Sequence, residues 1–554
     1  MASRFLLRYR RLPRALRWGL TSAVVIALVA GIWFTIQYQI ERRITRMLEN
    51  TPVLLAEGVT CRTDIGKVRI SLSRMGVSLY DLRVTAPARR RTADGPSSIL
   101  KVSIPRITLS GVRISRAADT GHRQFHARRL TIDRPDVLFE GHPAPRTHDT
   151  LKSPHVAFPL SIDHVALNDA SVRIGFWRDN QRNTLTAEGL TFVFDNFAAR
   201  DTLAIPLTPP DLTQLPSPSL LPQGSGVSVR ADALAYTFKN GALRMEVDTL
   251  ALDTRQGTFS VHRVAQIPQY DKEQYTLRVG DRSDWITWEV LRVACDSLQI
   301  PSFADGDDLL RIGTVAIDSL RIDGFKDRNQ KQSDNIRPTL YEALQQLPAG
   351  IAISSIGIGD VDIRYEEISR GATVPAVITL SSLKTTIDGL TNRPADPDYT
   401  YDLTADGLLF GTTPMHAVLT LPAAPGNEQF SLAASMAPLH APDVSPVTEP
   451  LANIKITSGE LHSAGVFLAG NSQQATSTVN MIYSDLQIAI LKKRDPMQER
   501  ELLTNLANGV VLRRSNPENG RLRTGEGTCR RDEHKSFWNY IWKTAFSGVV
   551  DLAL

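Results

Sequence analysis

The sequence predicts a mainly β protein, with one N-terminal transmembrane helix followed by an elongated, repeated, bulged antiparallel β-sheet and a few short helices near the C-terminus. Three observations predict this fold class. A charge-free stretch near the N-terminus is long enough to span a bilayer. Alternation of apolar and polar residues with a period of two recurs along the rest of the chain. One spacing of apolar residues also repeats throughout that region.

Residues 18–38 carry no charge, and a helix of about 21 residues spans a hydrocarbon core of about 30 Å. Six arginines and no acidic residue lie within residues 1–17, whereas the charges after the stretch are mixed. This bias predicts a cytoplasmic tail and puts the chain after the anchor outside the cytoplasm. Trp18 and Trp33 suit the two membrane interfaces. A cleaved signal peptide is the alternative, but its apolar core would be shorter and would end at small residues.

The composition of the 554 residues is typical of folded protein, with 42% apolar and 22% charged residues. A net charge of +5 without a basic stripe interleaved with aromatics does not indicate nucleic-acid binding. The three cysteines are far apart and predict neither a zinc site nor a disulfide framework. No phosphate-binding loop, nucleophile elbow, zinc-protease or dinucleotide motif occurs. We therefore expect no enzyme, no cofactor and no metal.

Two proline-rich stretches interrupt the strand pattern, because proline cannot donate a ladder hydrogen bond. They divide the chain after the anchor into a β-rich unit at 39–205, a linker or loop at 206–223, a β-rich repeat unit at 224–421, a second linker or loop at 422–450, and a C-terminal β-rich unit at 451–554 that ends in an amphipathic helix.

The repeat places apolar residues at offsets of 0, 3, 5, 8, 10 and 12 from its first residue. SIDHVALNDASVRI follows it from Ile162, and AISSIGIGDVDIRY follows it from Ile353. Other copies begin at Ile104, Ala127, Val290, Ile312 and Leu451. The pair between offsets 5 and 8, such as Asn168-Asp169, is typical of a turn or bulge. This pair shifts the apolar–polar alternation by one position. Both halves of a kinked strand or tight hairpin therefore keep their apolar residues on one face.

A continuous apolar face needs a second sheet, helices or a ligand to cover it. The residues predicted to line it are Ile162, Val165, Leu167, Val172, Ile174, Ile312, Val315, Ile317, Ile353, Ile356, Ile358 and Ile363. The alternative is that the faces pack on each other as sandwich cores.

Three segments predict helices. Thr339–Gln346 and Pro496–Asn508 are short, and the latter has proline at its start and Gly509 after its end. After Lys535 a broad apolar stripe at helical spacing predicts a terminal helix. Its Trp538 and Trp542 are predicted at a membrane interface or against a partner. The alternative is a helix docked on the last sheet.

Several segments together resemble the AsmA-like family of bridge-like envelope proteins, related to AsmA and TamB, and in particular its Bacteroidetes-type members. They are the N-terminal anchor, the early strands GKVRISLSRMGVSLYDLRV, the unit LTIDRPDVLFE, the later ITSGELHSAGVF and the ending RRDEHKSFWNYIWKTAFSGVV. The resemblance implies a single-pass protein of the bacterial inner membrane, with a cytoplasmic N-terminus and the bulk of the chain in the periplasm.

The resemblance further implies an apolar β-groove that shields phospholipid acyl chains, in lipid transport to the outer membrane or in its maintenance and assembly. Lipid, membrane and proteins of outer-membrane assembly or lipid transport are the implied partners. A membrane-anchored scaffold that assists outer-membrane protein assembly through its sheet edges, without carrying lipid, is the alternative function. An envelope hydrolase is a third hypothesis, but it needs converging titratable groups that the sequence does not show.

Overall fold

A computed structural model describes residues 53–554 with gaps at 57–58, 72, 90–97, 117–122, 142–159, 179–180, 200–225, 280–283, 301–308, 331–334, 348, 373, 437, 493–494 and 509–511, and before them only residues 35, 38–39 and 41–42. Trp18, Trp33, most of the predicted anchor at 18–38 and the predicted linker at 206–223 lie outside the described residues. Among those described, no helix combines the length and the apolar character needed to cross a membrane.

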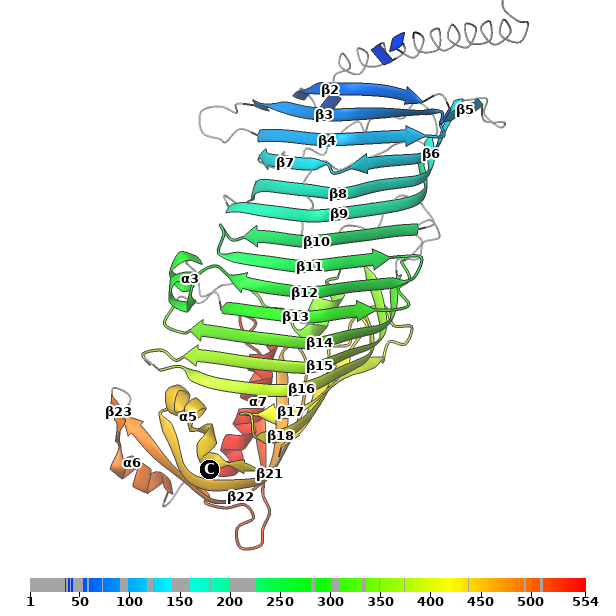
Figure 1. The fold of residues 1–554 in the computed structure, drawn as a ribbon. Helices are drawn as coiled ribbons and strands as arrows, with labels where there is room; N and C mark the ends of the chain where they lie inside the picture. Colours follow the sequence, from blue (N-terminus) through cyan, green and yellow to red (C-terminus); the bar gives the residue numbers. More distant parts are fainter. Residues whose placement is uncertain are drawn as a thin grey trace, which may run out of the picture. The chain divides into compact units, whose positions relative to one another are not determined.

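The protein is mainly β (Figure 1). The chain divides into two compact units. Unit 1 comprises residues 1–174, 191–208 and 222–224, and unit 2 comprises residues 175–190, 209–221 and 225–554. The division passes through two long strands, β8 (Leu160–Arg178) and β9 (Gln181–Ala199).

Unit 1 contains β1 (Val53–Ala56), β2 (Val59–Ser71), β3 (Gly76–Arg89), β4 (Ser98–Ser110), β5 (Arg113–Arg116), β6 (Arg123–Asp133), β7 (Asp136–Gly141) and most of β8. Strands β1 to β4 pair in sequence order. Both β6 and β7 then pair with β4, because the chain breaks its alternation between them at Arg134-Pro135. β8 pairs with β6, and β5 forms a hairpin with β6.

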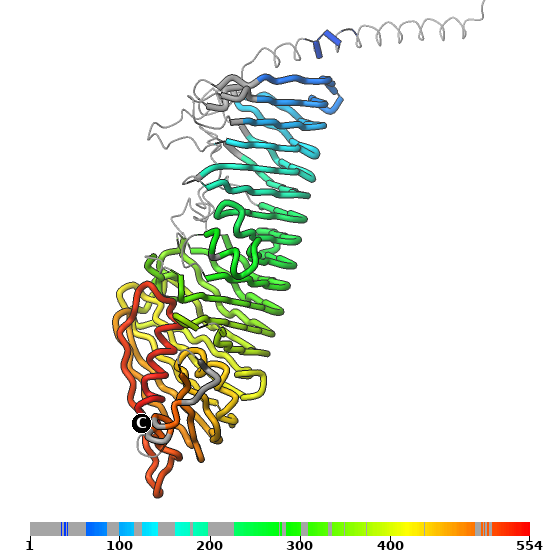
Figure 2. Tube along the Cα trace, turned by 90° about the vertical axis from the view of Figure 1, so that its left-hand side faces the viewer, coloured from blue at the N-terminus to red at the C-terminus, as the bar shows by residue number. Residues whose placement is uncertain are grey.

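The strands of unit 2 are β10 (Gly226–Phe238), β11 (Leu243–Asp253), β12 (Thr258–Pro268), β13 (Trp285–Cys295), β14 (Leu309–Asp327), β15 (Gly350–Ile368), β16 (Ala376–Thr391), β17 (Thr400–Leu409), β18 (Thr413–Pro422), β19 (Phe430–Met436), β20 (Leu439–His440), β21 (Ile454–Gly470), β22 (Gln474–Lys492), β23 (Asp495–Glu499) and β24 (Thr524–Arg530). Neighbours in sequence pair from β10 to β19, and β21, β22 and β24 continue the sheet. Figure 2 shows this succession from the side.

The prediction of a purely antiparallel sheet is wrong for two pairs. β6 pairs with β8 and β14 pairs with β15 in parallel, so the strands form mixed sheets. A parallel pair needs a crossover between its strands. In unit 2 the crossover is the connection between β14 and β15, which contains α4 (Leu340–Gln345). In unit 1 the chain passes through β7 before it reaches β8.

The described helices are α3 (Lys272–Val279), α4, the 3-10 helix η3 (Ala441–Val444), α5 (Ser445–Ala452), α6 (Glu501–Leu506) and α7 (Phe537–Ala553). α3 and α4 lie in the middle of the chain, not near its C-terminus as predicted. The helix predicted at Thr339–Gln346 is confirmed as α4, and Thr339 and Glu342 form its capping box.

Two further segments differ from their sequence-based expectations. The helix expected from Pro496 begins only at Glu501, because residues 495–499 add strand β23 to β22. The proline-rich stretch 422–450, expected as a linker or loop, contains β19 and most of α5, and it lies inside unit 2. Proline is tolerated in the first turn of a helix, where the backbone N–H has no intrahelical partner.

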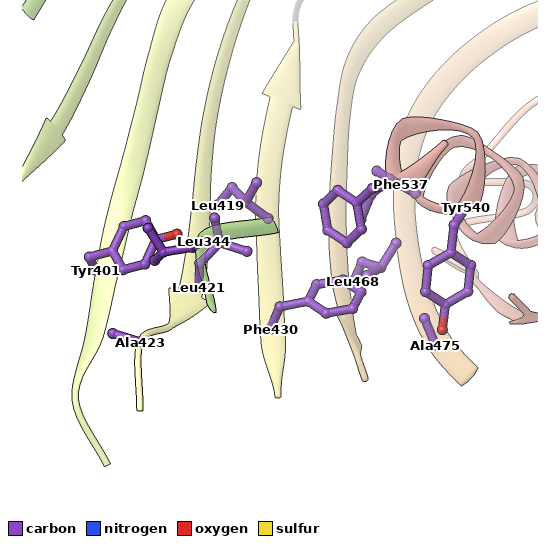
Figure 3. Packing of buried hydrophobic residues seen from close by; sticks show 11 residues of the cluster. Leu344, Tyr401, Leu419, Leu421, Ala423, Phe430, Leu468, Ala475, Phe537 and Tyr540 are labelled. Carbon is purple, nitrogen blue, oxygen red and sulfur yellow. The ribbon is translucent and has the colours of Figure 1, made fainter. Parts of the chain in front are cut away.

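The main core of unit 2 lies where α7 packs on the last strands (Figure 3). Phe537 and Tyr540 of α7 meet Phe430 of β19 edge to face, at ring-centroid distances of 5.0 and 6.1 Å. Burial raises the pKa of Tyr401, in the same cluster, to about 12. The cluster is Leu344, Tyr401, Leu419, Leu421, Ala423, Phe430, Leu468, Ala475, Phe537, Tyr540 and Ile541.

Three glycines let α7 approach β24 closely. A Cβ on Gly527 would lie 2.5 Å from the backbone nitrogen of Gly548, and one on Gly525 would lie 2.0 Å from the Gly548 carbonyl oxygen. Because backbone atoms cannot move aside as a flexible side chain can, these positions accept no larger residue while α7 stays in place.

We predict that Gly527→Ala destabilises unit 2 by about 1–3 kcal/mol, because the added methyl group overpacks the contact between β24 and α7. The unfolding midpoint of the full chain measures it. Gly465→Ala on β21 is the matched control, since a Cβ there meets no atom within 4 Å. Equal midpoints for the two variants would contradict the close packing of α7.

Candidate functional site

Copies of the sequence repeat pair with each other in register. In the parallel pair β14–β15, every apolar position of the copy from Ile312 lies opposite the same position of the copy from Ile353. The opposed pairs are Ile312–Ile353, Val315–Ile356, Ile317–Ile358, Leu320–Val361 and Ile322–Ile363. In unit 1, the copy from Ala127 on β6 matches the copy from Ile162 on β8 in the same way. Apolar side chains therefore meet across both parallel pairs.

The same spacing also fits antiparallel neighbours, because the intervals between the offsets 0, 3, 5 and 8 are the same when they are counted from either end. Along β13–β14, Val290, Val293 and Cys295 lie opposite Leu320, Ile317 and Val315, respectively. Cys295 occupies an apolar position, as expected; it is half-buried, and burial raises its pKa. One spacing thus keeps apolar residues opposed in both strand directions.

The predicted turn or bulge pair has the expected backbone. Asp169 and Arg134, each the second residue of its pair, have φ values of 51° and 48°, in the left-handed region. On β15 the pairing with β16 shifts register between Ile358 and Val361. β8, β14 and β15 continue as single strands through the pair. The copies that begin at Ala127 and Val290 instead end a strand there.

Apolar residues opposed in this way form rows that cross unit 2. Directly opposed residues of neighbouring strands point to the same face of a sheet. The first row is Val229, Leu252, Phe259, Cys295, Val315, Ile356, Ile387, Leu403, Leu419, Leu432 and Leu468. The second row is Leu234, Val247, Val264, Val290, Leu320, Val361 and Leu383. We call the face that carries these rows the apolar face of unit 2.

Unit 1 has an apolar face built in the same way. One row is Val68, Leu79, Ile107, Ile132 and Leu167, and another is Ile70, Val77, Leu109, Leu130 and Val165. Val165 and Leu167 are predicted lining residues, and both are half-buried.

The predicted lining residues neither belong to a buried core nor are fully exposed. Ile162 is buried, with 5% of its surface exposed, and the other eleven are half-buried. None of the twelve belongs to a core cluster formed by the described residues. Along β14 residues that alternate with them, such as Arg311, Ala316 and Asp318, are exposed. The lining residues on β14 therefore share the better protected face of their strand.

The first row of the apolar face of unit 2 is buried at one end only, among the residues that the structure describes. Leu419 and Leu468 lie in the first row and are 2% and 0% exposed, since they belong to the cluster that α7 joins (Figure 3). Cys295, Val315 and Ile356 lie in the same row and are half-buried. The first row thus belongs to a buried core at β18–β21 and is half-buried at β13–β15, whereas Val361 and Leu383 at the end of the second row are buried.

Charged residues lie between the apolar rows on their strands. Arg263 of β12 follows His262 and precedes the row residue Val264, and it bridges Glu246, Asp248 and Glu289. Its hydrogen bond to Glu289 is the chief cause that raises the pKa of Arg263. No group of three or more histidine, cysteine, aspartate or glutamate side chains suited to a metal ion occurs in the described part of the chain.

Strand alternation predicts that Glu366 and Glu367 face solvent, and this prediction is wrong. Each is only 7% exposed. Glu366 accepts a hydrogen bond from Lys272 Nζ of α3 at 2.8 Å and pairs with Arg364, and Glu367 pairs with Arg328. Burial alone would raise the pKa of Glu366, but Lys272 and Arg364 outweigh burial and lower it. α3 supplies Lys272 and the β14–β15 crossover supplies Arg328, both remote in sequence, whereas Arg364 lies on β15 itself.

Because its pKa is lowered in the folded protein, the ionised Glu366 stabilises the folded state at pH values above the ordinary glutamate pKa of 4.5. This stabilisation is lost as the pH falls through the lowered pKa that Glu366 has in the folded state. We predict that Glu366→Gln costs on the order of 1–3 kcal/mol at pH 7 and makes unfolding less sensitive to pH below 4.5. Urea unfolding of the full chain between pH 7 and pH 3 measures it. Glu188→Gln, at an exposed site, is the control. The prediction is contradicted if the parent chain, Glu366→Gln and Glu188→Gln show the same dependence of unfolding free energy on pH.

A hollow of about 380 Å³ lies on β13–β16. Each strand contributes a central residue and its two neighbours, and the central residues form a further opposed row of Trp288, Ile322, Ile363 and Leu380. Ile363 is a predicted lining residue. The hollow belongs to the sheet surface itself, because every residue that lines it comes from these four strands.

α7 is docked on the last strands, and the membrane-interface or partner role of its tryptophans stays a prediction. The helix docks on these strands through Phe537, Tyr540 and Ile541, which are buried. Trp538 and Trp542 lie on its other side and are 55% and 47% exposed. The sequence predicted the aromatic stripe, and the packing on β22 and β24 decides which residues of the helix stay outside.

Comparison of the chain with family models, with curated proteins and with solved structures finds no match in any of the three.

Proposed function

We propose that this protein is a non-catalytic, AsmA-like lipid-handling protein of a bacterial envelope, which shields phospholipid acyl chains on its apolar face during transport to, or maintenance and assembly of, the outer membrane. The observation that carries the proposal is the continuity of the apolar rows from strands where α7 covers them to strands where they are half-open. A face of this kind binds hydrocarbon without directional chemistry.

The dimensions suit an acyl chain. Neighbouring strands lie about 4.8 Å apart, so the half-open rows from β10 to β15 extend about 24 Å across the sheet. A hydrocarbon core of about 30 Å holds two leaflets, so one acyl chain needs about 15 Å. Each methylene group removed from water contributes about 0.8 kcal/mol. The half-open rows are therefore long enough to take a whole acyl chain.

The predicted anchor supplies the location in this proposal. Residues 18–38 would hold the chain in the inner membrane, with the basic residues 1–17 in the cytoplasm and the strands of both units in the periplasm. Lipid leaving that membrane would then meet the apolar faces of the same chain. The direction of movement would come from partners or gradients, which is consistent with a chain whose sequence contains no phosphate-binding loop.

Photo-crosslinking tests whether lipid occupies the apolar face. We expect a photoreactive phenylalanine analogue at position 317 or 358 of the full chain to form an adduct with phospholipid in a bacterial host labelled with radioactive phosphate. These two positions lie opposite each other in the repeat register, and both are half-buried. The analogue at position 316, which is exposed and adjacent on the same strand, is the matched control.

Adducts at 317 and 358 without adducts at 316 would support the proposal. Equal labelling at all three positions would indicate unspecific contact with membrane, and would contradict it. No lipid adduct, together with protein adducts at strand edges, would favour the scaffold that assists outer-membrane protein assembly. Ile317→Asp with Ile358→Asp should also abolish co-purifying phospholipid, whereas Ala316→Asp should leave it unchanged.

A further inference from the structure

The outer side of α7 exposes a stripe of large apolar residues. Trp538, Trp542, Phe546 and Val550 recur every four residues and are 55%, 47%, 42% and 36% exposed. Residues at this spacing lie on one face of a helix. The rings of Trp542 and Phe546 stack at a centroid distance of 5.8 Å. We call these four residues the α7 stripe.

The stripe cannot be hidden by turning the helix. Ser477 Oγ of β22 donates a hydrogen bond of 2.7 Å to the Thr544 carbonyl oxygen on the buried side of α7. Tyr540 Oη donates to the Asn471 carbonyl oxygen at 3.2 Å. A rotation would also drive side chains into the glycines of β24, which leave no room for a Cβ. The stripe therefore stays exposed in the folded unit.

Two hydrogen bonds from Arg513 also hold the C-terminal end of α7. The backbone N–H of Arg513 donates to the Ala553 carbonyl oxygen at 3.0 Å, and Arg513 Nε donates to the Leu554 carbonyl oxygen at 3.2 Å. Leu554 is itself 52% exposed. Both ends of the stripe are thus held on the same rigid surface.

Cationic residues accompany the stripe. Lys543 is exposed and follows Trp542 directly, and Arg514, Arg521 and Arg523 are exposed on the segment before β24, whose Arg513 contacts the C-terminal end of α7. Residues 512–554 carry eight lysines and arginines against five acidic residues, a net charge of +3. Leu522, between two of these arginines, is 58% exposed. Tryptophan beside cations suits the interface of an anionic bilayer, where rings enter the headgroup layer and cations meet phosphates.

We propose that the α7 stripe is a membrane-docking surface, which binds the headgroup region of a bilayer that contains anionic lipid. This surface is distinct from the apolar face: its residues point away from the sheet that α7 covers. Its binding to a bilayer does not require that the apolar face carry lipid. The two proposals can therefore fail separately.

Vesicle capture tests the surface. The full chain is held by an N-terminal tag in a phosphatidylcholine nanodisc, which occupies the predicted anchor, and is exposed to vesicles of phosphatidylcholine with or without phosphatidylglycerol. We expect capture of the vesicles that contain phosphatidylglycerol, weakened by salt, and at least about tenfold weaker capture by Trp538→Ser with Trp542→Ser. Lys543→Glu should weaken capture as well.

Leu277→Ser on α3 is the matched control, because it removes an apolar residue that is 77% exposed on another helix of unit 2. It should leave capture unchanged. An unchanged unfolding midpoint shows that each variant is folded, as expected for side chains outside the core. Capture that survives the double tryptophan change, or that is equal for both kinds of vesicle, would overturn the proposal. So would a folded parent chain that captures no vesicles, and the stripe would then fit a protein partner.

Discussion

The structure of both units depends on one backbone constraint, which is the two-residue pair that interrupts the strand alternation inside each repeat. A regular strand as long as β15 that carried this spacing without a bulge would turn the apolar residues after the pair to the opposite face. With it, both halves keep the same face, and the pairing shift between Ile358 and Val361 absorbs the extra residue. Because the central offsets read alike in both directions, this constraint holds for antiparallel neighbours and for the parallel pair β14–β15.

The consequence is an apolar face longer than the element that covers it. α7 has 17 residues and packs on β22 and β24, and the buried residues of the cluster that it joins reach back to Tyr401 of β17 and Leu344 of α4, with Ile351 and Ile387 partly buried against them. The rows continue beyond that cluster on strands whose apolar residues are half-buried. Half-buried apolar rows of this extent cost free energy in water unless something occupies them. This imbalance is the physical basis of the proposed lipid-binding role.

Charge is arranged so that it does not interrupt the rows. Arg263 and its carboxylate partners lie between row positions, and Glu366 is buried at a strand end against Lys272 of α3. The described residues thus place ion pairs beside the apolar face while the face itself stays hydrocarbon. The α7 stripe follows the opposite arrangement, because there the apolar side chains and the cations are exposed together. A surface for acyl chains and a surface for headgroups call for these two different arrangements.

The sequence by itself determined what depends on local spacing. The strand class, the repeat, the left-handed backbone at Asp169, the capped helix at Thr339 and the terminal helix with its tryptophans all follow from neighbours within a few residues. Only the tertiary structure decided the parallel pairing of β14 with β15, the burial of Glu366 and the extent of the face that α7 covers. These features rest on contacts between residues far apart in the chain, and a spacing pattern does not determine which distant segments come together.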